Sequence, residues 1–247
     1  MLFWPQFDKE PMISLRGQIR NQYLSLGQGR IFTIQDLSFD KAKTGHVAVY
    51  LSQQCKKGEI VRISRGAYYV PQTSVLGLGR IPVYEDEEIR FLLAKIGGYL
   101  SGAKIYNQMG LTEQVSSTVT IACPNPRRRF RYGNLDVECV KAYGCAYKDV
   151  SNLPYLHVLD ALKDIRHISG RTAQEVYDKI KEEYFSLYSK DELDRVISLT
   201  VDYPPRVRKI VSDILSDIGN EQGRRALTDT LLPTTHYKLG YVQRPLI

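Results

Sequence analysis

The chain has 247 residues, 43% hydrophobic and 25% charged, and its 34 lysines and arginines against 27 aspartates and glutamates give a net charge of +7. This composition is typical of a globular protein long enough for two domains. It contains no run of 18 apolar residues, and its first ten residues lack the regions of a signal peptide, so we expect a cytoplasmic protein that does not contact membranes.

The first predicted elements are three helices. Apolar residues at helical spacing predict a helix over residues 13–26, and Thr33 is expected to cap a short helix over 34–37 before a turn over 38–43. A longer helix is predicted over 44–57 and ends at Gly58. Its apolar stripe is Val47, Leu51 and Cys55, and the polar residues expected outside the stripe are His46, Tyr50, Gln53 and Gln54.

A basic hairpin follows these helices. Residues 60–64 and 67–70 alternate in polarity as strands do, Arg65 and Gly66 form the turn, and Pro71 ends the second strand. Three helices followed by a hairpin, in a unit of about 60 residues, predict a winged helix-turn-helix over residues 13–71.

The charge of this segment indicates a polyanionic partner. Residues 1–84 hold 11 lysines and arginines against 5 aspartates and glutamates, so +6 of the net +7 lies in one third of the chain. Basic residues that serve only solubility need not be concentrated in one part of the chain, whereas a protein that binds nucleic acid needs them gathered at its binding surface. We therefore predict that the helix over 44–57 enters the major groove of double-stranded DNA and that the hairpin contacts the phosphates or the minor groove. The predicted contact residues are Lys43, Thr44, His46, Tyr50, Gln53, Lys56, Lys57, Arg62 and Arg65.

Within this set, Gln53 is the candidate for contact with adenine and His46 for contact with a phosphate or a guanine.

The segment also resembles a known family. The run Ile-Phe-Thr-Ile-Gln-Asp-Leu at residues 31–37, and the pattern Arg-Ile-x-Arg-Gly-x-Tyr-Tyr-Val-Pro at 62–71, are similar to the N-terminal domain of AbiEi-type antitoxins. The resemblance extends over residues 13–145, through Gly-Tyr-Leu-Ser-Gly at 98–102. It implies a bacterial repressor that binds inverted repeats in its own promoter and neutralises a nucleotidyltransferase-like toxin encoded beside it.

The remainder of the chain is predicted as an α+β domain over residues 85–247. Residues 72–82 are predicted to form a linker. The acidic run 85–88 opens a helix over 89–96, and its charges are better explained by the positive end of the helix dipole than by binding of a metal ion. A helix over 101–109 and strands over 118–123 and 135–140 complete a part of helices plus a β-hairpin over 85–145.

From residue 154 to 218 the pattern is helical, and the tail beyond Gly219 is expected to be extended or docked. The fold class is therefore α+β: an N-terminal winged helix-turn-helix, then a mixed α/β domain with a small β-sheet and a helical C-terminal part.

An arginine cluster lies between the two predicted strands. It consists of Arg127, Arg128, Arg129 and Arg131. These side chains suit a second contact with nucleic acid or with a partner, and they equally suit a solvated strand edge that discourages pairing with other sheets.

The sequence shows no clear set of catalytic residues. A nuclease or nucleotidyltransferase needs carboxylates that converge on Mg²⁺, and the nearest such pair is Asp136 and Glu138, which alternate on one strand. Four cysteines and four histidines show no zinc spacing. We expect no catalytic residue, metal or cofactor; the alternatives are a nucleic-acid-processing enzyme and a plain regulator without a toxin.

Overall fold

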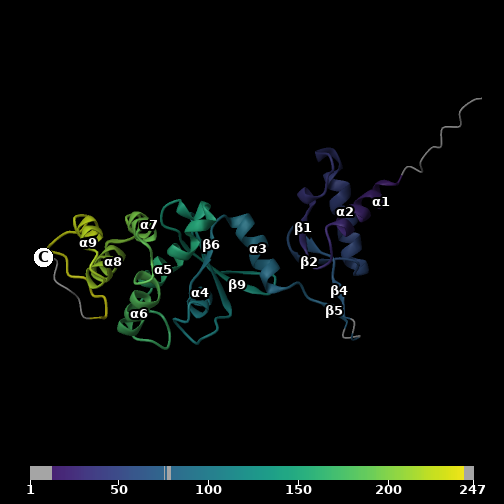
Figure 1. The fold of residues 1–247 in the computed structure, drawn as a ribbon. Helices are drawn as coiled ribbons and strands as arrows, with labels where there is room; N and C mark the ends of the chain where they lie inside the picture. The colour runs from purple at the N-terminus through teal and green to yellow at the C-terminus, as the bar shows by residue number, and fades with distance from the viewer. Residues whose placement is uncertain (1–12, 75, 77–78, 242–247) are drawn as a thin grey trace, which may run out of the picture. The chain divides into compact units, whose positions relative to one another are not determined.

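The computed structural model describes residues 13–74, 76 and 79–241 and divides the chain into two units. Figure 1 shows the fold, with most helices and several strands labelled. The N-terminal unit comprises Met1–Phe91 with Tyr132–Asn134, and the C-terminal unit comprises Leu92–Arg131 and Leu135–Ile247. The mixture of helices with small sheets confirms the predicted α+β class. The domain limits 13–71 and 85–247 stay a prediction, and the first ten residues, where we expect no signal peptide, lie outside the described part.

The N-terminal unit is built on a small antiparallel sheet in the order β1-β3-β2. Its core joins this sheet to the helices through Tyr23, Phe32, Val47, Leu51 and Ile60, and the rings of Tyr23 and Phe32 stack with centroids 6.0 Å apart. The elements are α1 (Leu15–Ser25), β1 (Ile31–Thr33), η1 (Ile34–Asp36), η2 (Lys41–Lys43), α2 (Thr44–Lys57), β2 (Val61–Ser64) and β3 (Ala67–Tyr69).

Local chemistry sets the ends of these elements. The Thr33 hydroxyl accepts a hydrogen bond from the Gln35 amide at 3.2 Å, and the Thr33 amide donates to Asp36 Oδ2 at 2.6 Å, so Thr33 caps the short helix as predicted. That helix, η1, is a single 3₁₀ turn. Gly58 ends α2 with a φ of +75°, which a side chain would disfavour.

The acidic run opens helix α3 (Glu85–Ile96), as predicted. Glu87 Oε1 also accepts the Ile31 amide of β1 at 2.8 Å, and Glu87 pairs with Arg90 at 2.7 Å. Two short strands, β4 (Gln72–Thr73) and β5 (Arg80–Ile81), pair within the segment predicted as a linker. Strands of two residues are too short to show a periodic pattern.

A second sheet has the order β6-β7-β9-β8 and is formed by β6 (Tyr99–Ser101), β7 (Thr118–Cys123), β8 (Phe130–Tyr132) and β9 (Leu135–Lys141). All of its residues except Tyr132 belong to the C-terminal unit. Strands β7 and β9 run parallel, so the two strands predicted as a hairpin are neighbours that point the same way. Alternating hydrophobicity marks a strand but does not specify its partner. Strand β8, which precedes β9 in the chain, was not among the predicted strands.

Helix α4 (Ala103–Gln108) begins two residues later than the predicted 101–109, because residues 99–101 form β6 instead. Gly98 and Gly102 flank this strand with φ values of +150° and +73°, and a side chain on either would collide with β7. These glycines therefore allow close packing between strands.

The helical part comprises α5 (Leu153–Lys163), α6 (Ala173–Ile180), the π-helical turn η5 (Lys181–Phe185), α7 (Lys190–Thr200), α8 (Pro205–Asp217) and α9 (Glu221–Thr228). Helix α9 occupies the first part of the tail that we predicted as extended or docked. Gly223 lies inside it, where a side chain would meet Ile197, so this glycine serves packing. Among the described residues, no helix combines the length and the apolar character needed to cross a bilayer.

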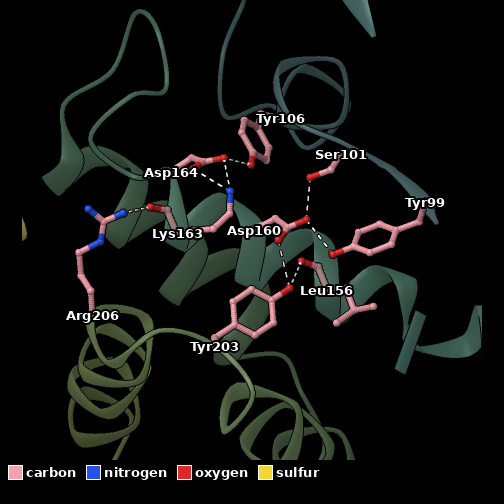
Figure 2. A network of polar contacts seen from close by, with 9 residues as sticks. All are labelled: Tyr99, Ser101, Tyr106, Leu156, Asp160, Lys163, Asp164, Tyr203 and Arg206. Carbon is pink, nitrogen blue, oxygen red and sulfur yellow. Dashed lines mark hydrogen bonds and ion pairs between the residues drawn. The ribbon is translucent and has the colours of Figure 1, made fainter. Parts of the chain in front are cut away.

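A polar cluster lies inside this unit, at Asp160 of α5, which is 1% exposed. Figure 2 shows three hydroxyl groups that point at its carboxylate. Tyr99 and Ser101 of β6 donate to Oδ2 at 3.0 and 2.6 Å, and Tyr203, which precedes α8, donates to Oδ1 at 3.1 Å. One carboxylate thus ties a strand to the connection between two helices.

Candidate nucleic-acid interface

Helix α2 has one buried face and one exposed face. Val47 and Leu51 are fully buried in the core of the N-terminal unit, whereas His46 and Gln53 are exposed. Gln54, which we expected outside the apolar stripe, is buried. Its position three residues after Leu51 places it on the same side of the helix.

The hairpin leads directly from this helix. Val61 and Ile63 of β2 pack in a small cluster with Ile31, while the Arg62 side chain is exposed. The register of the β2–β3 pair shifts between Arg62 and Ser64. At this irregularity the Nε atom of Arg62 donates a hydrogen bond to the Ser64 carbonyl at 3.2 Å. Gly66, at a φ of +80°, completes the turn beside the exposed Arg65. The turn is the wing of a winged helix.

Eight of the nine predicted contact residues have exposed side chains, and the ninth is half-buried Tyr50, which packs against the core. In the described part of the chain, the five basic members form no ion pair; they are Lys43, Lys56, Lys57, Arg62 and Arg65. Arg20 of the same unit, by contrast, pairs with Glu59 at 3.4 Å. The charge on α2 and on the wing is therefore available to an external anion.

Three exposed residues of α2 were missing from the prediction: Gly45, Val49 and Ser52. Val49 is 60% exposed, three residues after His46 and four before Gln53, and Gly45 is exposed one turn earlier. Sequence reasoning assigned apolar residues to the core and so passed over Val49. The available signal was its position outside the stripe of Val47 and Leu51.

The arginine cluster lies in the C-terminal unit, on the loop after β7 and on β8, and all four side chains are exposed. Arg129 Nη2 pairs with Glu138 Oε2 at 3.2 Å, across two exposed side chains. An exposed pair of this kind contributes little to stability.

The carboxylates and cysteines are the residues that could serve metal or redox chemistry. Glu138 is engaged by Arg129, and Asp136 is exposed. In the described ranges no group of three or more His, Cys, Asp and Glu residues is placed to hold a metal ion. All four cysteines are free thiols, and Cys123 and Cys139 are buried.

The helices, the three-stranded sheet and the exposed wing place the N-terminal unit in the class of winged helix-turn-helix proteins. Residues 22–71 match the model of the family described as "Transcriptional regulator, AbiEi antitoxin". The predicted resemblance is thus confirmed for these residues.

Among solved structures, the chain is similar to the RV2827C protein from Mycobacterium tuberculosis, at 13% identity and a TM-score of 0.49, with 85% of this chain and 78% of that chain covered. The search of curated proteins found no match.

Proposed function

We propose that this protein is a transcriptional repressor that binds double-stranded DNA in a sequence-specific manner. Helix α2 enters the major groove, and the wing binds the flanking phosphates. The observation that supports this function best is the exposed face of α2 and the wing, whose five basic residues have no ion-pair partner among the described residues. The family matched by residues 22–71 is described as one of transcriptional regulators and antitoxins.

The biological partner follows from the family resemblance. The DNA is the promoter of the protein's own operon, with inverted repeats, and the operon also encodes a nucleotidyltransferase-like toxin that this protein counteracts. Co-expression of the full chain with the adjacent gene product tests this part: we expect the chain to restore growth that the neighbour inhibits. Repression without a toxic neighbour would leave a plain regulator.

Binding to the promoter is measured by fluorescence anisotropy, with a shuffled duplex for comparison. Replacing Gln53 with alanine is expected to cost about 1–3 kcal/mol on the promoter and to relax the preference at one base pair, because a bidentate contact with adenine is lost. Gln108→Ala, at an exposed glutamine of α4, is the matched control and leaves binding unchanged. Full discrimination by Gln53→Ala would show that α2 does not read the sequence there, and metal-dependent cleavage of the duplex would favour the enzymatic alternative.

The arginine cluster is proposed as a second contact with the DNA backbone. The triple variant Arg127→Gln, Arg128→Gln and Arg131→Gln should weaken binding to all duplexes alike and lower the slope of log K against log salt by up to about three units. Arg129→Gln is the paired control, since Glu138 already neutralises this side chain. An unchanged salt slope would mean that these arginines only keep a strand edge solvated.

A further inference from the structure

Gly45 and Val49 are exposed neighbours on the surface of α2, and we refer to this pair as the apolar notch. They are four residues apart, so they are neighbours one turn apart on the same side of the helix. A Cβ atom added to Gly45 would meet nothing within 4 Å, so the space above this glycine is open. Side chains lean toward the N-terminus of a helix, so the Val49 side chain leans toward this open space from one turn away, with none of its atoms within 4 Å of the added Cβ.

Stability of the helix does not explain either residue. Glycine is a much poorer helix former than alanine, and Gly45 has a helical backbone in which no φ is positive and no neighbour excludes a Cβ. Valine is β-branched, and at 60% exposure Val49 gains little from packing. His46 and Gln53, two of the predicted contact residues, flank the pair on the same face.

We propose that this notch receives the C5-methyl group of a thymine in the major groove and so fixes a thymine at one position of the site. This inference rests on the proposed DNA binding. Thymine is the base that presents a methyl group in this groove, and an apolar side chain is the contact that recognises it. The missing side chain at position 45 lets the base edge approach the helix, and Val49 then packs against the methyl group.

The test begins with the tightest duplexes that the full chain selects from a random library. Each thymine is replaced in turn by deoxyuridine, which removes only the methyl group. For the unmodified protein, one replacement is expected to weaken binding about fourfold, the equivalent of about 0.8 kcal/mol for one buried methyl group. In Val49→Ala the same replacement should have almost no effect. Val201→Ala, at an exposed valine of the C-terminal unit, is the matched control and keeps the fourfold penalty.

Gly45→Ala separates recognition from folding. We expect an unfolding midpoint that is unchanged or higher, together with binding at least severalfold weaker, because the new methyl group fills the notch. The thymine proposal would be contradicted if deoxyuridine weakened binding equally in Val49→Ala and in the unmodified protein, or if the selected sites shared no thymine. Either result would leave the proposal of DNA binding unaffected. A chain that selects no duplex at all would overturn both proposals.

Discussion

Replacing both wing arginines, Arg62 and Arg65, with glutamine is expected to weaken binding to every duplex by at least about a hundredfold at about 0.1 M salt. Each charge-assisted hydrogen bond to a phosphate contributes about 1.5–3 kcal/mol, and the two arginines have no acidic partner among the described residues to compensate for their loss. The slope of log K against log salt should fall by about two units, since each phosphate neutralised contributes about 0.9. Salt titrations by fluorescence anisotropy measure both quantities.

Arg20→Gln provides the matched control for the wing. Its guanidinium already pairs with Glu59 in the same unit, so we expect a change in slope well below that of either wing arginine. Sequence preference should survive in the double wing variant, because α2 still reads the bases. If the wing variant bound DNA with an unchanged salt slope, the wing would not contact phosphates, and the orientation proposed for the unit would be wrong.

The sequence allowed close prediction of the N-terminal unit because the signals there are local. The limits of α2, from Thr44 to Lys57, follow from an apolar stripe and from a glycine that tolerates positive φ. The wing follows from alternation around an Arg-Gly turn. The nine candidate contact residues could be proposed because exposure on these short elements follows from periodicity, although apolar Val49 does not fit a search for polar groups.

Longer-range features were not predictable in this way. The parallel pairing of β7 with β9 depends on packing between distant segments, which no local pattern specifies. A glycine in a sequence usually indicates the end of a helix, yet Gly223 lies inside α9 because a larger side chain there would collide with Ile197. Asp160 lies among apolar positions of α5, and its hydroxyl partners come from residues 43–61 positions away in the chain. Only the three-dimensional structure reveals that this carboxylate has partners.

Asp160→Ala is expected to destabilise the C-terminal unit by about 3–5 kcal/mol, a large share of the stability of an ordinary domain. The substitution leaves the hydroxyl groups of Tyr99, Ser101 and Tyr203 buried without their acceptor, and each such donor costs about 1–3 kcal/mol before relaxation. Urea unfolding followed by circular dichroism measures the loss. Asp229→Ala, at an exposed aspartate after α9, should stay within about 0.5 kcal/mol. A comparably small loss in Asp160→Ala would show that the three hydroxyl groups find other acceptors.

The charge of Asp160 gives a second, pH-dependent measure of this cluster. Burial raises the pKa of the Asp160 carboxyl, an effect that Lys163 and the three hydroxyl donors oppose in part. The folded state therefore holds a proton over a pH range in which the unfolded chain has lost it, so the contribution of Asp160 to stability falls as the pH rises above about 3.9, the ordinary aspartate value. Asparagine keeps one carbonyl acceptor and does not titrate. We therefore expect the stability difference between the unmodified chain and Asp160→Asn to be largest in acid and to shrink with rising pH. A difference that grows with pH would instead indicate that the hydroxyl groups lower the pKa and hold Asp160 as a stabilised anion.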